Sequence, residues 1–257
     1  MITDILSPAS ASQGGKGAYV LAPYVRFLEI QDDTARLLDL DGEFYALSAT
    51  GRALLRASLL QDLATAVRSV AMAYNVDAHR VQQDLHPFLA TLEHKRLIYP
   101  AHALPTAGKR EARWPAVMLR ALLHRVTAST ATGTVRAGSV LTLAYVTTRL
   151  MGLARTITIW QRAVPLLAMA AADRASVARD IDEVVRTVAA QHLLPLTCKE
   201  RALCCWALLR ALGLPAHLVI GIALFPLASH CWCELDALIL TDEEDKCRGF
   251  TPVWRYA

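Results

Sequence analysis

The chain of 257 residues is 54% hydrophobic and 19% charged, with a formal net charge of +4. This composition excludes a disordered chain and suits one large or two small globular domains. The net charge is small and the basic residues form no long run, which argues against a nucleic-acid-binding protein. Residues 1–20 contain no apolar stretch of signal-peptide length, so we expect a cytoplasmic protein with reduced cysteines.

The N-terminal part of the sequence predicts a small domain over residues 19–100. Residues 1–18 are rich in Ser, Ala and Gly and indicate a loose lead-in. Three antiparallel strands are expected at Val25–Ile30, Ala35–Leu40 and Glu43–Leu47. Turn signals separate these strands at Asp32-Asp33 and Asp41-Gly42. Three helices are then expected over about 49–60, 62–74 and 77–95.

A linker is expected at 101–113, which contains Pro, Gly and a short charged run, and a helix-rich domain over 114–257. Its helical patterns cover 115–127, 138–162, 174–191 and 198–212. Its strand patterns cover 216–224, 229–235 and 238–242. The segment Ala211–Cys233 has no charged residue, but its Gly, Pro and His residues predict a helix end and two buried strands rather than a membrane span. The expected fold class is therefore α+β.

A candidate nucleophile lies at the start of the helix expected over 198–212. Residues 197–200, Thr-Cys-Lys-Glu, have the capping-box pattern and precede an apolar helical run, which places Cys198 at the first helical position. There the helix dipole and the free backbone N–H groups favour the thiolate, the form that attacks carbonyl carbons. Cys204 and Cys205 lie two turns further along and are expected to pack in the core.

A candidate base and its orienting acid, His230 and Asp242, lie in the last two expected strands. Because side chains alternate along a strand, the two face the same side only if the loop around Asp236 has three or five residues, or if the strand contains a bulge. A two-residue loop would place them on opposite faces. With the required geometry, His230 can take the proton of Cys198 and Asp242 can hold the imidazole in the right tautomer.

Each of these residues also has a purely structural interpretation. A cysteine at a helix start and a histidine in an apolar strand are most often packing residues. Cys231 and Cys233, beside His230, offer a second alternative as zinc ligands. Strand alternation puts both cysteines on the face opposite His230, however, and the sequence has no second Cys-x-x-Cys pair. We therefore expect no metal site.

The second domain resembles a known family. The similar residues are Cys198-x-x-Arg201-x-Leu203, Gly213-x-Pro215-Ala216-His217-Leu218-Val219-Ile220-Gly221, and His230-x-Trp232-x-Glu234-x-Asp236 with Asp242. They are similar to the lasso-peptide leader peptidases, which are transglutaminase-like, papain-like cysteine peptidases with a Cys-His-Asp triad and a small antiparallel sheet. The resemblance implies that Cys198, His230 and Asp242 form that triad. The chain departs from the family pattern at Ala237, where Gly is usual, and at Cys231 and Cys233.

The first domain resembles the PqqD-like fold, a winged-helix-like recognition element for ribosomally synthesised and modified peptides (RiPPs). The similarity lies in Leu38-x-Leu40-Asp41-Gly42-x-x-Tyr45-x-Leu47-x-x-x-Gly51 and in 92–98. The resemblance implies that a leader peptide adds as a strand to the third strand, beside the third helix. The implied leader-binding residues are Glu43, Phe44, Tyr45, Ala46, Leu47, Arg80 and Asp84. Core packing is an equal interpretation of Tyr45 and Leu47.

Together the resemblances imply a cysteine endopeptidase that cleaves a lasso-peptide precursor between leader and core. The implied partner is an asparagine-synthetase-like cyclase that uses ATP to close the macrolactam. The chain has no P-loop motif, so we assign it no cofactor. Two other functions are open: a Cys-His-Asp acyltransferase of transglutaminase type, and a non-catalytic adaptor that presents the leader. Neither a nucleic-acid partner nor membrane insertion is expected.

Overall fold

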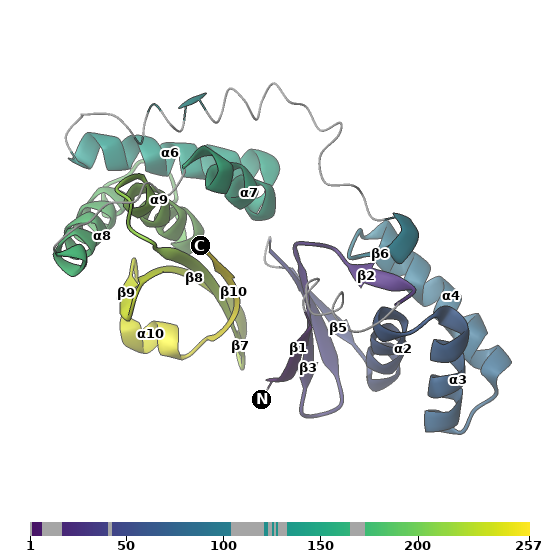
Figure 1. The fold of residues 1–257 in the computed structure, drawn as a ribbon. Helices are drawn as coiled ribbons and strands as arrows, with labels where there is room; N and C mark the ends of the chain where they lie inside the picture. Colours follow the sequence, from purple (N-terminus) through teal and green to yellow (C-terminus); the bar gives the residue numbers. More distant parts are fainter. Residues whose placement is uncertain are drawn as a thin grey trace. The chain divides into compact units, whose positions relative to one another are not determined.

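The computed structural model describes residues 2–6, 17–40, 43–103, 133–164 and 173–257, with further positions at 121, 122, 125 and 127. The chain divides into two compact units, Met1–Lys109 and Arg110–Ala257. Each unit combines an antiparallel sheet with helices, so the chain has the expected α+β fold (Figure 1).

The first unit is built on a four-stranded antiparallel sheet with the order β1-β3-β4-β5. Its strands are β1 (Ile2–Leu6), β3 (Val25–Ile30), β4 (Ala35–Asp39) and β5 (Phe44–Leu47). The three expected strands are present, but the expectation of a loose lead-in is wrong for Ile2–Leu6. This segment pairs with β3, and the Ser, Ala and Gly content of residues 1–18 concealed a short apolar strand. The expected Asp41-Gly42 turn lies outside the described residues.

Three helices follow the sheet: α2 (Ala49–Leu60), α3 (Leu63–Tyr74) and α4 (Ala78–His94). The side chains of Ser48, Asp62 and Asp77 cap them by accepting backbone hydrogen bonds. An unexpected two-stranded sheet of β2 (Tyr19–Leu21) and β6 (Ile98–Pro100) joins the start of this unit to its end. Three-residue strands are too short to show alternation in a sequence. The core between sheet and helices includes Phe27, Leu37, Leu55, Leu89 and Ile98.

A 3₁₀ turn, η1 (Ala101–Ala103), ends the described part of the first unit. The remainder of the expected linker, 104–113, lies outside the described residues, as does nearly all of the helix expected over 115–127.

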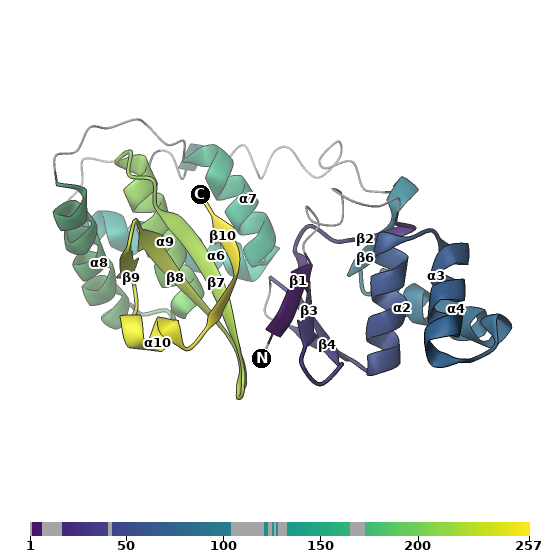
Figure 2. The same ribbon diagram turned by 60° about the horizontal axis from the view of Figure 1, so that its bottom comes forward.

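The second unit places helix α9 (Cys198–Ala211) between other helices and a sheet. It contacts α6 (Gly133–Met151) and α8 (Arg174–Ala190) on one side and strand β8 (Leu227–Leu235) on the other (Figures 1 and 2). Every side chain of α9 from Glu200 to Arg210, except Arg201, is buried. The helical pattern expected over 138–162 is divided at Gly152, whose φ of 75° suits glycine, and helix α7 (Leu153–Ala163) follows α6 there.

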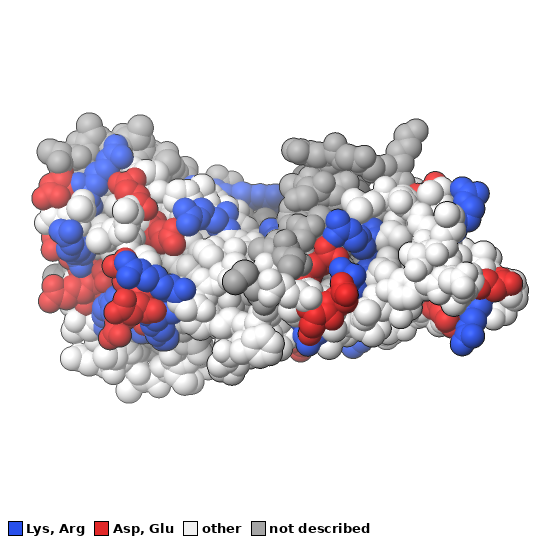
Figure 3. Space-filling model, turned by 90° about the horizontal axis from the view of Figure 1, so that it is seen from below, with Lys and Arg blue, Asp and Glu red and all other residues white. Residues whose placement is uncertain are grey.

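The sheet of the second unit has the order β10-β7-β8-β9. Its other strands are β7 (His217–Leu224), β9 (Leu238–Leu240) and β10 (Thr251–Tyr256). The short helix α10 (Glu244–Arg248) connects β9 to β10, and neither α10 nor β10 was expected from the sequence. The uncharged segment Ala211–Cys233 forms the end of α9, strand β7 and part of β8. No described helix combines the length and apolarity needed to cross a membrane. On the face drawn in Figure 3, acidic and basic side chains are interspersed.

Candidate active site

Cys198 is the first residue of α9, as the capping-box pattern predicts. The backbone N–H of Thr197 donates to Oε2 of Glu200 at 2.7 Å, and the Thr197 hydroxyl donates to the same oxygen at 2.5 Å. The hydroxyl of Thr148, on α6, donates to the other oxygen of Glu200 at 3.1 Å. The first turn of α9, which carries Cys198, is therefore fixed by one buried carboxylate and by a contact from a neighbouring helix.

Glu200 is only 3% exposed, yet its pKa is lowered, which favours the ionised form. Burial by itself would raise the pKa of this carboxyl, but the hydrogen bonds from Thr197 and Thr148 outweigh burial and hold the pKa below its ordinary value. A negative charge at a helix N-terminus is also favoured by the helix dipole.

The described residues include all six cysteines, and Cys198 is the one that is not fully buried. Burial raises the pKa of the Cys204, Cys231 and Cys233 thiols well above the ordinary value, which suppresses their thiolates.

His230 lies in β8 and is 6% exposed. Its ring packs against Phe250, with centroids 5.0 Å apart, and stacks on Trp232 at 6.0 Å. Gly221 of β7 is paired with His230, and a Cβ there would come within 2.6 Å of the Trp232 ring and 2.9 Å of Phe250. The Gly221 of the family-like motif thus makes room for the aromatic side chains that hold His230.

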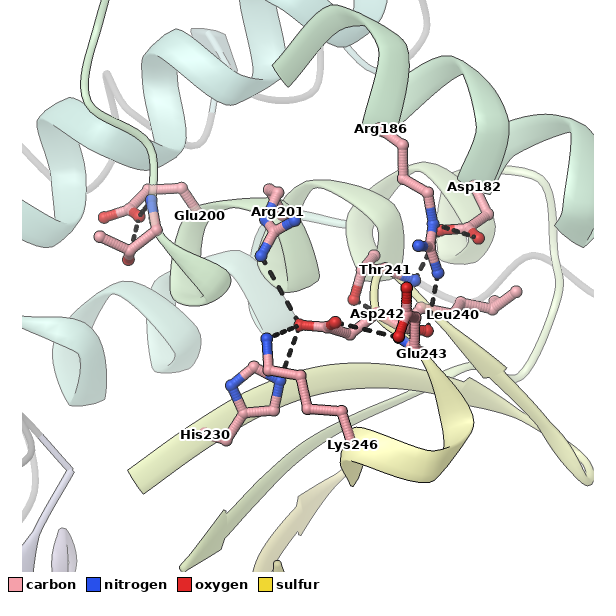
Figure 4. Close-up of polar contacts among 11 residues, drawn as sticks. Asp182, Arg186, Glu200, Arg201, His230, Leu240, Thr241, Asp242, Glu243 and Lys246 are labelled. Carbon is pink, nitrogen blue, oxygen red and sulfur yellow. Dashed lines mark hydrogen bonds and ion pairs between the residues drawn. The ribbon is translucent and has the colours of Figure 1, made fainter. Parts of the chain in front are cut away.

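The structure brings His230 and Asp242 together: Nε2 of His230 lies 2.9 Å from Oδ2 of Asp242 (Figure 4). The contact is short but not linear, since the Nε2 proton does not point at the oxygen. Burial lowers the pKa of His230 below its ordinary value, although the Asp242 charge raises it. The lowered pKa favours the neutral imidazole, which is the form that can accept a proton.

The expected loop length between His230 and Asp242 is wrong. Leu235 pairs with Leu238, so the hairpin has a two-residue loop, with Asp236 at a φ of 53°. Such a loop would put the two side chains on opposite faces if β9 continued to Asp242. The strand ends at Leu240 instead, and Thr241 adopts a left-handed φ of 72°, which turns Asp242 toward His230. Strand alternation does not decide the direction of the Asp242 side chain, because β9 ends two residues before it.

Two cations share the Asp242 carboxylate with His230. Lys246 of α10 lies 2.8 Å from Oδ2 and Arg201 of α9 lies 3.6 Å from it. Burial raises the pKa of Asp242, but the Lys246 contact and a backbone hydrogen bond from Glu243 outweigh this and hold the pKa below its ordinary value. Figure 4 shows Arg201 approaching the carboxylate from the side of α9, opposite His230.

Cys198 lies on the same face of α9 as Arg201, because residues three apart on a helix are neighbours. Arg201 reaches the Asp242 oxygen that contacts His230, so this side of the first turn of α9 faces Asp242, whereas no hydrogen bond within the described residues joins Cys198 to His230. A thiol at a helix N-terminus, a neutral imidazole and an ionised carboxylate are together able to perform nucleophilic acyl chemistry.

The expected leader-binding residues lie in two elements of the first unit. Phe44 to Leu47 form the edge strand β5 and Glu43 directly precedes it, whereas Arg80 and Asp84 are exposed on α4. The Tyr45 hydroxyl donates to Glu43 at 2.5 Å, which raises the pKa of Tyr45 to about 12, and Lys95 at the end of α4 lies over the Tyr45 ring at 5.0 Å. No hydrogen bond or ion pair within the described residues joins Arg80 or Asp84 to β5.

The backbone of β5 alternates between groups bonded to β4 and groups that face the free edge. Asp39 donates to Glu43 at 3.1 Å, so the bonded pairs along this ladder continue at Leu37 with Tyr45 and at Ala35 with Leu47. The N–H and C=O groups of Phe44 and Ala46 therefore point away from β4. These are the groups that an added strand would pair with.

Three charged residues near Asp242, namely Lys246, Asp182 and Arg186, were not expected from the sequence. Lys246 lies in a segment of mixed charges, which is typical of a solvent-exposed surface. Asp182 and Arg186 on α8 have the i, i+4 spacing of an ordinary surface ion pair. No local signal in the sequence connects Asp182 and Arg186 to Thr241 and Asp242, since the bonded residues are 59 and 56 positions apart.

Two family models match the chain, in the order that the two resemblances imply. Residues 34–98 match the family model for coenzyme PQQ synthesis protein D (PqqD), and residues 141–255 match the model for the transglutaminase-like superfamily. The predicted recognition of a PqqD-like element followed by a transglutaminase-like domain is confirmed. Neither the comparison with curated proteins nor that with solved structures gave a match.

Proposed function

We propose that this protein is a cysteine peptidase of RiPP maturation, which binds the leader of a lasso-peptide precursor and cleaves it from the core. A PqqD-like element implies a precursor peptide as partner, and the transglutaminase-like superfamily uses cysteine-based chemistry. The observation that carries the proposal is the His230–Asp242 contact beside the N-terminus of α9, where Cys198 stands. Hydrolysis of an acyl intermediate is the simplest outcome of these three groups.

In the proposed mechanism His230 accepts the thiol proton of Cys198, and the thiolate attacks the scissile carbonyl carbon. The tetrahedral oxyanion is stabilised by the backbone N–H of Cys198, which has no partner inside the helix because it is in the first turn. His230 then donates the proton to the leaving amine, which is the N-terminus of the core. Water, activated by His230, releases the leader as a carboxylic acid. Asp242 orients the imidazole and stabilises its charged form.

The leader is proposed to pair with the free edge of β5, through the backbone groups of Phe44 and Ala46, beside α4. Residues 1–100 alone are then expected to bind the leader without cleaving it. Isothermal titration with the leader peptide tests this in a fragment whose folding is first shown by circular dichroism. The freed core N-terminus would pass to an ATP-using, asparagine-synthetase-like cyclase, which is the proposed second partner.

Acyl transfer is the second candidate, because the transglutaminase-like match covers enzymes that pass the acyl group to an amine. Incubating the full chain with a precursor peptide and measuring the products by mass spectrometry separates the functions. Free leader with a new carboxyl group supports the peptidase, and an amine adduct supports the transferase. An unchanged precursor that nevertheless binds the chain supports the non-catalytic adaptor and contradicts the proposal.

A further inference from the structure

Two residues of α8, Asp182 and Arg186, bind the backbone of Thr241 and of Asp242. Oδ1 of Asp182 accepts a hydrogen bond from the Thr241 N–H at 2.5 Å. Nη2 of Arg186 donates to the backbone carbonyl of Asp242 at 2.7 Å. The two side chains also bind each other, because Nε of Arg186 donates to Oδ2 of Asp182 at 2.8 Å (Figure 4). Together they form a closed clamp over Thr241 and Asp242.

The residue inside the clamp has an unfavourable backbone conformation. Thr241 has a φ of 72°, and a β-branched residue is seldom found in the left-handed region. It is also 2% exposed, so the conformation is enforced within the packed unit and not by solvent. Such a conformation persists only where neighbouring groups over-determine it. The hydrogen bond from the Thr241 N–H to Asp182 is one of these constraints.

The conformation of Thr241 decides which face Asp242 points to. Cys233 pairs with Leu240, so a strand continued in the same register would pair Asp242 with Cys231. Cross-strand partners point to the same side of a sheet, and Cys231 faces away from its neighbour His230. An extended Thr241 would thus remove the carboxylate from His230, whereas the left-handed Thr241 delivers it to 2.9 Å.

We propose that Asp182 and Arg186 are positioning residues that hold Asp242 on the His230 face of the sheet by enforcing the left-handed conformation of Thr241. Helix α8 would then supply this clamp in addition to packing against α6 and α9. The inference that Asp242 acts in catalysis rests on the proposed function. The clamp itself concerns only the geometry of Asp242 and His230.

The test is the titration of His230 in the full chain, because Asp242 raises the pKa of this imidazole. The charged groups that face His230 are Asp242, Lys246 of α10 and Arg201 of α9. The variants Asp182→Ala and Arg186→Ala leave all three in the chain. If the clamp is lost and Asp242 turns away, the pKa of His230 should fall, as it should in Asp242→Asn. The resonance is identified among the 8 histidines by its loss in His230→Gln.

Asp180→Ala is the matched control, because Asp180 is an exposed acid on the same helix. It should leave the titration of His230 and the melting temperature unchanged. Leader removal, measured in parallel, should fall roughly 10²-fold in kcat for Asp182→Ala with little change in KM, the size of loss that misplacement of a catalytic group produces.

Thr241→Gly provides the rescue, because glycine adopts a positive φ without the steric conflict of threonine. In the Asp182→Ala background, Thr241→Gly should reverse part of the fall in the His230 pKa and part of the loss in kcat. It should not restore the melting temperature, because the contacts of the Thr241 side chain are lost. A brace that merely stabilises the unit predicts the opposite pattern, in which glycine lowers stability further and restores neither quantity.

A folded Asp182→Ala chain with an unchanged His230 titration would overturn the clamp. A titration that shifts and is not restored by glycine would overturn the role of Thr241 in it. If the wild-type chain removes no leader while the titration shifts as expected, the proposed function fails and the clamp stands.

Discussion

The free edge of β5 and the carboxylate of Asp242 differ in how much of the fold holds them. β5 is bonded on one side only, to β4, and offers the backbone groups of Phe44 and Ala46 on the other. Asp242 is held by contacts from α8, α9, α10 and β8. The proposed peptide recognition therefore depends on an open backbone, which tolerates side-chain changes. The proposed chemistry depends on side chains that several elements must place together.

The largest effects are expected at the His230–Asp242 pair. His230→Ala should reduce leader removal on the order of 10⁶-fold, as loss of the histidine does in a serine triad, because no base remains. Asp242→Asn should cost less, on the order of 10⁴-fold, since the base remains and only its orientation and charge stabilisation are lost. Leader affinity, measured by titration, should be unchanged in both variants. A loss of affinity comparable to the loss of rate would remove the separation between recognition and chemistry.

Proline in β5 should separate the two kinds of backbone group. Ala46→Pro removes an N–H that faces the free edge, so it should weaken leader binding roughly 10-fold or more while the unit still folds. Tyr45→Pro removes an N–H that is bonded to Leu37, so it should lower the melting temperature of the unit. Titration with leader and thermal melting of both variants provide the comparison. Equal loss of binding in two folded variants would place the leader elsewhere.

Glu200→Ala should destabilise the second unit by about 1–2 kcal/mol, because it leaves the N–H and the hydroxyl of Thr197 without their acceptor. The folded pKa of Glu200 is depressed, so its ionised form contributes stability above the unfolded pKa of about 4.3. That contribution is lost as the pH falls through the lower folded pKa. Thermal melting across this range should show the difference between wild type and variant shrinking toward acid pH. A constant difference would mean that the charge is not involved.

The smallest effect is expected at the side chains over β5. Lys95→Ala removes the ammonium group from the Tyr45 ring and should cost about 0.5–1 kcal/mol of stability or leader affinity. Arg68→Ala, on α3 and away from β5, is a control with the same change in charge. If Lys95→Ala reduces leader affinity far more than this, recognition depends on side chains and not chiefly on the backbone of the edge strand.

The same contrast explains what the sequence could and could not predict. The capping box at Thr197 to Glu200 is a local pattern, so it located the start of α9 and Cys198 correctly. The strands of the first sheet are likewise separated by local turn signals, at Asp32-Asp33 and Asp41-Gly42. The contact between His230 and Asp242 was expected, but with the wrong loop length. The left-handed conformation of Thr241 could not be expected from the sequence, because β-branched residues seldom adopt a positive φ.

The clamp of Asp182 and Arg186 was out of reach for a different reason. Asp182 and Arg186 bind backbone groups of Thr241 and Asp242. Because every residue has these groups, no sequence pattern identifies the ones that are bound. The free N–H groups of Phe44 and Ala46 are likewise set by the pairing phase of β4 with β5, which the sequence alone does not fix.

The most direct test of the account is Cys198→Ala in the full chain, measured by mass spectrometry of the precursor and by titration with its leader. The account predicts that leader removal disappears while leader affinity and melting temperature stay close to those of the wild type. Cys204→Ala, which removes a buried thiol from the same helix, should keep its activity. Continued cleavage by Cys198→Ala would contradict the central claim.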